Sequence, residues 1–233
     1  MKLKTVIDRI LFPKRCSCCD EVISINKDIC ESCKEKLHIL NDICNICGIQ
    51  KDKCECNRRV FLFNGITAPF ENNGSAQEGV YGMKFCGMPY ASGFYGKNMY
   101  DSIKRDFKDV KFDIITAVPM SKRTKRKRGY NQAELLAKAI AKEMNVPYCF
   151  KMLLKCRDNS TQHNLTLKER VKNVAGAYKA DSAVCGKTVL LVDDIKTTGA
   201  TLNECSKQLL LCGASSVYCV VALMTEKSSQ VKK

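Results

Sequence analysis

Short apolar runs alternate with amphipathic segments along most of the chain. Consecutive apolar residues predict buried strands at 189–192 and 217–223, the largely apolar stretch 112–118 predicts another, and a further strand is expected at 58–65. Apolar residues at helical spacing predict helices at 90–107, with Tyr100, Ile103 and Phe107 on one face, at 132–144, and from about Leu202 to Gly213. The pattern indicates one medium α/β domain with a small appendage.

The most informative stretch is 189–202, where an apolar strand is followed by Asp193 and Asp194 and then by a small, hydroxyl-rich turn. The turn contains Thr197, Thr198, Gly199, Ala200 and Thr201, and a helix is expected to start there. A helix N-terminus after a tight loop presents free backbone N–H groups and a positive dipole end. The hydroxyls and the glycine suit a phosphate monoester, whereas the acid pair suits a neighbouring diol or a metal.

Charge and targeting signals narrow the classes of partner. The formal net charge is +15, which favours polyanions such as nucleic acid, a membrane surface or a substrate that carries pyrophosphate. The sequence has no stretch long enough to span a bilayer, and Asp8 and Arg9 interrupt the first apolar run, which argues against a signal peptide. We therefore expect a cytoplasmic location.

Nine of the 16 cysteines lie between Cys16 and Cys56, and all of these except Cys18 form four close pairs. Two pairs can complete one tetrahedral four-cysteine zinc site, so eight ligands make two sites. The simplest assignment is sequential, with the first two pairs at one zinc and the last two at the other: Cys16, Cys19, Cys30 and Cys33, then Cys44, Cys47, Cys54 and Cys56.

Two details of this assignment stay open in the sequence. The pair Cys54-x-Cys56 is one residue shorter than a usual zinc knuckle, so either one or two zinc ions are possible. Cys18 could replace Cys16 or Cys19 as a ligand.

Four thiolates leave no open coordination position, which favours structural over catalytic zinc. So short a segment has little core of its own, and zinc would supply its folding energy.

A strongly basic loop is expected after the strand at 112–118. Six of the eight residues from Ser121 to Arg128 are basic, and Gly129-Tyr130-Asn131-Gln132 follows. Open α/β sheets bind ligands beyond the carboxyl ends of their strands, which is where this run lies. It could bind a pyrophosphate, a nucleic-acid backbone or both in turn. The long polar segment 153–178 is expected to form a mobile cover over the same edge.

The order of these motifs resembles the ComF family, which includes ComFC and GntX-like proteins and joins a double zinc ribbon to a type I phosphoribosyltransferase domain. The resemblance spans roughly residues 16–223. It rests on the paired cysteines, Met83-Lys84-Phe85, the block Arg128-Gly129-Tyr130-Asn131-Gln132, Gln162 with Arg170 and Asn173, and the stretch from Asp193 to Thr201, which matches the phosphoribosyl pyrophosphate (PRPP) motif.

The resemblance implies a residue-level account of the site. Asp193 and Asp194 would hold the ribose hydroxyls and act in catalysis, and the turn from Thr197 to Thr201 would bind the 5′-phosphate. Contacts to pyrophosphate or another polyanion would come from Lys84, Arg123, Arg126 and Arg128. Mg²⁺ would accompany PRPP. The implied domains are a double zinc ribbon at 1–60, a phosphoribosyltransferase domain of mostly parallel sheet with helices on both faces at 61–225, and a flexible tail at 226–233.

Two functions remain possible at this stage. The first is a phosphoribosyltransferase, in the glycosyltransferase class, with an unidentified acceptor and a link to DNA uptake in natural competence. The second is a non-catalytic module that binds single-stranded DNA through the basic run and the ribbon and keeps the PRPP fold as a sensor or scaffold. Other competence proteins are candidate partners. The absence of tryptophan and the 7% aromatic content favour backbone contacts over base stacking in this second reading.

Overall fold

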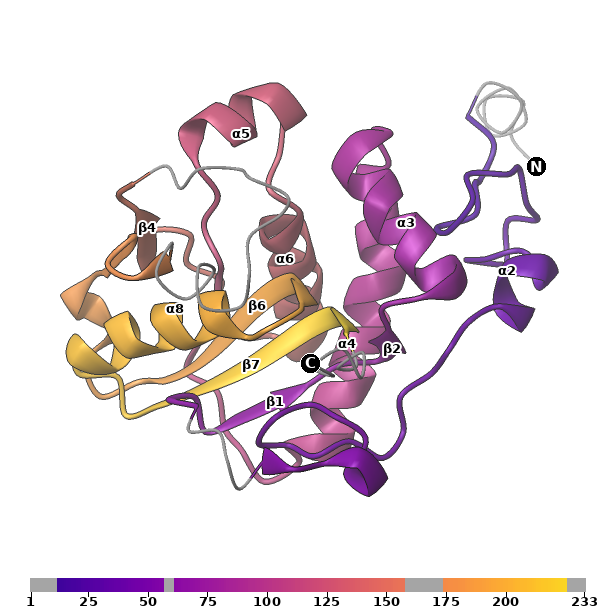
Figure 1. Cartoon of the computed structure of the whole chain (residues 1–233). Coiled ribbons are helices and arrows are strands. Elements are labelled where there is room, and N and C mark those ends of the chain that lie inside the picture. Colours follow the sequence, from indigo (N-terminus) through magenta and orange to yellow (C-terminus); the bar gives the residue numbers. More distant parts are fainter. Residues whose placement is uncertain (1–11, 57–60, 158–173, 226–233) are drawn as a thin grey trace, which may run out of the picture.

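A parallel sheet forms the centre of the protein in the computed structural model, which describes residues 12–56, 61–157 and 174–225 (Figure 1). β6 (Thr188–Lys196) lies between β3 (Ile114–Ala117) and β7 (Ser216–Met224), and both pairings are parallel. β1 (Gly65–Thr67) and β2 (Phe70–Glu71) pair in parallel with successive parts of β7. The residues at the centre of β6 and β7 are fully buried, because helices and loops cover both faces. The predicted parallel sheet is confirmed.

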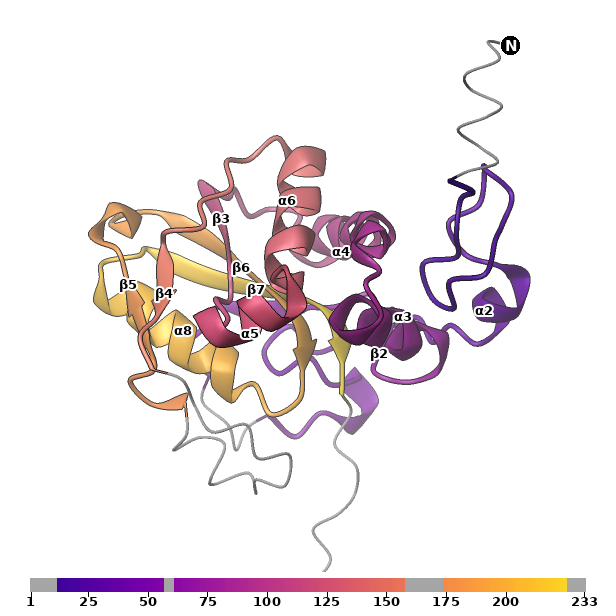
Figure 2. The same ribbon diagram turned by 90° about the horizontal axis from the view of Figure 1, so that it is seen from above.

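Helices cover the two faces of this sheet. On one face α3 (Gly74–Phe85), α4 (Ser92–Asp106) and α6 (Gln132–Met144) enclose a core that contains Met99, Leu136 and Leu190. On the other face α8 (Ala200–Leu211) and the antiparallel pair β4 (Leu153–Lys155) and β5 (Tyr178–Ala180) pack over a second core. Figure 2 shows α6 and α4 on the side of the sheet opposite α8. Two 3₁₀ turns complete this part, η3 (Pro89–Ala91) and η4 (Ser182–Val184).

Several expected elements differ in the structure. The strand expected at 58–65 is wrong for residues 61–64, which bend before β1. There the Asn64 side chain accepts a hydrogen bond from the Val217 N–H, whereas in a regular strand a backbone carbonyl would accept it. Helix α4 faces inward with Tyr95, Met99 and Ile103, and Tyr100 is half-buried. The basic run is not a loop but the helix α5 (Lys122–Arg128).

Other expectations fall on segments outside the described residues. These are 57–60, most of the polar segment after β4, with Gln162, Arg170 and Asn173, and the tail 226–233. The cysteine-rich segment ahead of the sheet contains α2 (Glu31–Glu35) and η1 (Lys51–Lys53) as its helical elements. Among the described residues, no helix combines the length and the apolar character that a membrane span requires.

Candidate functional site

The candidate site lies where β6 ends and α8 begins. Gly199 takes a left-handed conformation (φ 79°) and turns the chain into α8, whose first residue is Ala200. A hollow of about 30 Å³ opens there, and its lining includes Asp193 and the turn Thr197–Thr201. This volume suits a small group rather than a whole nucleotide. The first turn of α8 presents backbone N–H groups and a positive dipole end at the hollow, so a phosphate is the kind of group that fits.

The two carboxylates lie inside β6 rather than after it, because the strand continues to Lys196. Side chains of consecutive strand residues point to opposite faces of a sheet. Asp193 accordingly lines the hollow beside α8, whereas Asp194 forms an ion pair with Lys84 of α3 at 3.0 Å. The structure thus gives the two acids different surroundings, although they are adjacent in the sequence.

The environment of Asp193 favours its neutral form. Burial, followed by the neighbouring Asp194 carboxylate, raises the pKa of Asp193 to about 8, against the opposing effects of the Asp194 N–H and of Lys84. The Asp194 N–H donates to Asp193 Oδ1 at 2.9 Å and fixes the carboxyl group. A half-buried carboxyl group with a raised pKa, at the mouth of a hollow, is typical of a ligand-binding position.

Lys84 reaches the site because the last turn of α3 is held in place. The Met83 carbonyl accepts hydrogen bonds from the Tyr130 hydroxyl (2.7 Å) and the Gln132 amide (2.9 Å). Asn131 caps α6 by accepting from the Ala133 N–H, and it also donates to the Val118 carbonyl at the end of β3. The block Tyr130-Asn131-Gln132 therefore connects α3, β3 and α6 and positions Lys84 beside Asp194.

Helix α5 carries six basic residues among its seven, and none of them is buried. The Ser121 hydroxyl caps its first turn, and Gly129 ends it in a left-handed conformation (φ 82°). Among the predicted polyanion contacts, the structure brings Arg128 to the end of α3, where its guanidinium lies over the Phe85 ring at 5.0 Å from the centroid. Arg123 and Arg126 lie on the exposed surface of α5, and Arg126 lines an open hollow of about 450 Å³ with Lys122, Lys125 and Gly129.

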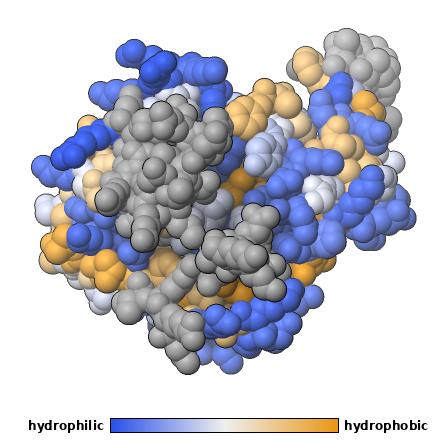
Figure 3. Space-filling model, viewed as in Figure 1, coloured by the Kyte–Doolittle hydropathy of each residue, from blue (hydrophilic) through white to orange (hydrophobic). Residues whose placement is uncertain are grey.

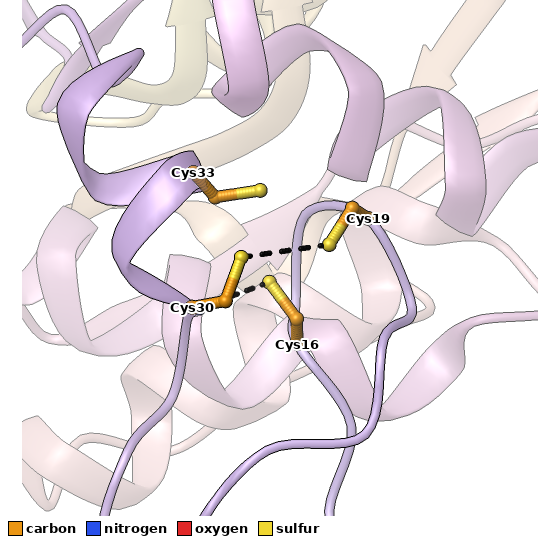
Figure 4. Close-up of side chains that lie close together, drawn as sticks. All are labelled: Cys16, Cys19, Cys30 and Cys33. Carbon is orange, nitrogen blue, oxygen red and sulfur yellow. Dashed lines mark hydrogen bonds between the residues drawn. The ribbon is translucent and has the colours of Figure 1, made fainter.

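The cysteines gather in two clusters, and in each cluster all four sulfur atoms lie within 4.8 Å of one another. The first contains Cys16, Cys19, Cys30 and Cys33 (Figure 4), and the second contains Cys44, Cys47, Cys54 and Cys56. Sulfur–sulfur distances of 3.7 Å (Cys19–Cys30), 3.7 Å (Cys44–Cys56) and 3.5 Å (Cys47–Cys54) are close to the roughly 3.8 Å edge of a tetrahedral zinc–thiolate site. The cysteines gather in the two groups that the sequential assignment gives, and the donor sets fit two structural zinc ions.

Cys16 belongs to the first cluster, whereas the nearby Cys18 does not. Although burial opposes it, backbone N–H groups of Cys19 and Cys30 lower the pKa of Cys16 to about 7, which favours a thiolate ligand. Burial instead raises the pKa of Cys18 to about 12, and its sulfur lies 3.8 Å from the Tyr95 hydroxyl, outside the cluster. Cys16 and Cys19 are therefore the candidate ligands, and Cys18 packs against α4 as a thiol.

Comparison with known proteins identifies both parts of the chain. A phosphoribosyl transferase domain family matches residues 130–233, and a double zinc ribbon domain family matches residues 7–60. The DNA utilization protein YhgH of Escherichia coli is 32% identical over 105 residues, which cover 45% of this chain and 46% of that protein.

Two competence proteins are also similar. Competence protein F of Haemophilus influenzae is 32% identical over 108 residues, 45% of this chain and 47% of that protein. Competence protein ComFC of Bacillus subtilis is 26% identical over 154 residues, 66% of this chain and 58% of that protein. The chain spans about half the length of the curated relatives it matches. With both domain families matched in this order, the chain belongs to the ComF/YhgH family and combines a double zinc ribbon with a phosphoribosyltransferase domain of the type I fold.

Proposed function

We propose that the chain binds PRPP with Mg²⁺ at the end of β6 and acts as a phosphoribosyltransferase on an acceptor that is still unidentified. The observation that carries this proposal is the shared hollow of Asp193 and the Thr197–Thr201 turn at the N-terminus of α8. One end of this hollow suits a phosphate and the other a diol, and a phosphate next to a diol is the 5′ side of a ribose phosphate.

Each part of PRPP has a candidate partner in this arrangement. The threonine hydroxyls and N–H groups at the start of α8 would bind the 5′-phosphate. The Asp193 carboxylate, once ionised, would accept hydrogen bonds from ribose hydroxyls. Lys84 is held on the opposite side of β6 by Asp194, 3.0 Å away, and Arg128 lies at the same end of α3. These two cations would neutralise the pyrophosphate as it leaves.

The residues present fit a Mg²⁺ ion that arrives with the substrate. Within the described residues, the two cysteine clusters are the groups of three or more metal-ligating side chains, so the carboxylates do not form a cage of their own. Mg²⁺ commonly keeps few protein ligands and binds through substrate phosphates. When bound, it would supply positive charge to the pyrophosphate.

The reaction would replace one bond at C1 of the ribose by another. The C1–oxygen bond breaks, the pyrophosphate departs with the electron pair, and the acceptor nucleophile forms the new bond as it loses a proton. Positive charge develops on the ribose ring as the pyrophosphate leaves. An ionised Asp193 beside the ring would stabilise that charge, and Asp194 would act through the position of Lys84.

Isothermal titration of the zinc-loaded protein with PRPP and Mg²⁺ tests the proposal. We expect binding by the unmodified chain and at least about tenfold weaker binding by Asp193→Asn, which keeps the shape of the side chain but cannot become a carboxylate. Asp109→Asn is the matched control, because Asp109 is exposed on the surface after α4. Absence of PRPP binding by the unmodified chain would contradict the proposal.

The six basic residues of α5, five of them exposed, favour a second candidate, the binding of single-stranded DNA. Contacts to phosphates release counterions, so the affinity should fall steeply with salt. Fluorescence anisotropy of a labelled oligonucleotide at 50 and 200 mM salt measures this slope. We expect the double variant Arg123→Ala/Arg126→Ala to weaken binding and flatten the slope, and an affinity independent of salt would exclude this candidate.

A further inference from the structure

Two aromatic side chains stand exposed on the last turns of α3. Tyr81 and Phe85 are four residues apart, their ring centroids are 5.9 Å apart, and their planes differ by 29°. The exposed fractions are 44% for Tyr81 and 63% for Phe85. Figure 3 shows hydrophobic surface at this end of α3, close to the hydrophilic surface of α5. The pair therefore offers an accessible, nearly parallel stack of rings next to a strongly basic helix.

Cations flank both rings. The Arg128 guanidinium lies 5.0 Å from the Phe85 centroid, and the Lys84 ammonium lies 5.8 Å from the Tyr81 centroid. Arg128 is the last residue of α5, so the aromatic pair directly adjoins the basic helix. An i, i+4 aromatic pair alone adds only about 0.2–0.5 kcal/mol to a helix. That small gain does not account for the position of two exposed rings beside six basic residues.

We propose that Tyr81 and Phe85 form a stacking platform for an unpaired base of single-stranded nucleic acid whose phosphates lie along α5. Aromatic platforms next to cationic grooves bind single strands, because every base has a π-face and every nucleotide has a phosphate. The positive charge on α5 favours a nucleic-acid strand over a free base, because a free base has no phosphate to pair with these cations. The platform rests on the second candidate function, the binding of single-stranded DNA, and does not depend on PRPP binding. It replaces the expectation that contacts are made to the backbone alone.

The absence of tryptophan from the chain allows a direct optical test. Phe85→Trp introduces a single tryptophan into the platform, and stacking of a base on it should quench its fluorescence when a thymidine 12-mer is added. Phe150→Trp is the matched control, because Phe150 is 61% exposed and also has a cation near its ring, Lys151 at 5.6 Å, but has no aromatic partner in the platform. We expect quenching in the first variant and none in the second.

An affinity measurement separates base stacking from phosphate contacts. Loss of a stacking ring costs about 5- to 150-fold in affinity per base, so Phe85→Ala and Tyr81→Ala should each weaken binding of the 12-mer by that order. Phe150→Ala should leave the affinity unchanged. An abasic 12-mer, which keeps the phosphates, should bind the unmodified chain and Phe85→Ala equally well. Thermal melting confirms that the exposed substitutions leave the fold intact.

Two outcomes would overturn the proposal. If Phe85→Ala and Tyr81→Ala bind the 12-mer as the unmodified chain does, the rings take no part and α5 acts through the backbone alone. If free thymidine quenches the tryptophan at position 85 as effectively as the 12-mer at equal base concentration, the platform serves a free base and not a strand. Neither result bears on PRPP binding, which is measured separately.

Discussion

The two four-cysteine clusters have the same ligands but attach to different parts of the phosphoribosyltransferase domain. The ribbon of the first cluster has a minimal core of its own, in which Cys16, Cys18 and Cys33 are the buried members. The ribbon of the second cluster adds Leu40 and Ile43 to the large core around β6 and β7. Zinc must therefore contribute more to the folding of the first ribbon than to that of the second.

The contacts of the first ribbon lie on α3 and on the neighbouring Tyr95 of α4. The Ser75 hydroxyl donates to the Cys33 carbonyl at 2.6 Å, and the Cys18 sulfur lies 3.8 Å from the Tyr95 hydroxyl. A Cβ atom at Gly79 would collide with the Ser17 carbonyl and the Tyr95 hydroxyl, so the ribbon touches the helix backbone itself. The first zinc site thus supports the helix that carries Lys84.

The contacts of the second ribbon lie at the edge of the sheet. The Asn45 carbonyl accepts from the Ile66 N–H of β1 at 2.7 Å, and Gly48 faces the Met224 side chain at the end of β7. None of these contacts involves α3. The difference teaches that equivalent metal sites can support different elements, and that the first cluster has the closer structural connection to the candidate PRPP site.

Removal of each cluster in turn should have the largest effect and tests the comparison directly. Cys19→Ser/Cys30→Ser should lose one zinc per chain, unfold the first ribbon, speed amide exchange in α3 and weaken PRPP binding at least about tenfold, since structural zinc supplies roughly 10–16 kcal/mol of folding free energy. Elemental analysis, hydrogen exchange and titration measure these changes. Cys54→Ser/Cys56→Ser should also lose one zinc but leave exchange in α3 unchanged. Equal exchange in both variants would refute the difference.

A steric change at the ribbon–helix contact should have an intermediate effect. The methyl group of Gly79→Ala pushes Ser17 and Tyr95 away from α3. We expect a loss of about 1–3 kcal/mol in the free energy of unfolding, measured with urea. Gly93→Ala on α4 is the control, because no atom lies within 4 Å of the added Cβ, and it should leave stability unchanged or slightly raised. Equal stabilities of the two variants would show that the ribbon does not pack closely against α3.

The pH dependence separates Asp193 from both zinc sites. Because the pKa of Asp193 is raised in the folded chain, its ionisation costs folding free energy, and stability should fall as pH rises from about 4 to about 8. PRPP affinity should rise with pH in the range 6 to 8, by up to about tenfold per unit, because only the carboxylate accepts from the ribose hydroxyls. Asp193→Asn should remove this contribution to the slope, with both zinc ions retained. An identical slope in the variant would exclude Asp193 as its source.

The smallest effect is expected at the other end of α3. Tyr130→Phe removes one of two hydrogen bonds to the Met83 carbonyl, and Gln132 keeps that carbonyl paired. A loss of about 0.5–1.5 kcal/mol in stability is therefore expected, with a PRPP affinity changed less than by Gly79→Ala. A larger effect on PRPP affinity for Tyr130→Phe would place the main support of Lys84 at α6 and not at the ribbon.

The strongest local patterns could be read from the sequence. The apolar run of β6, its acid pair and the following turn predict the strand, the loop and α8, because each is fixed by neighbouring residues. The cysteine pairs predict the two clusters, since ligands two residues apart reach one metal. Helix α6 has regular apolar spacing and Asn131 as a cap, and its predicted bounds match the structure.

Elements that depend on distant contacts could not be predicted. Helix α3 contains Gly79 and Gly82, each unfavourable in a helix interior by about 1 kcal/mol, and its stability comes from packing against α2 of the ribbon, η3, β2 and β7. Helix α5 has no apolar face, so its charge pattern indicated a loop although Ser121 and Gly129 cap it. Because α3 was not predicted, the i, i+4 spacing of Tyr81 and Phe85 carried no signal, and neither did the ion pair of Lys84 with Asp194.

The most direct measurement is a crystal structure of the zinc-loaded chain with PRPP and Mg²⁺. The account predicts the 5′-phosphate in the turn from Thr197 to Thr201, ribose hydroxyls on Asp193, and the pyrophosphate on the side of Lys84. A 5′-phosphate bound elsewhere, for example along α5, with the hollow at the start of α8 empty, would contradict the central claim that this turn and Asp193 form a PRPP site.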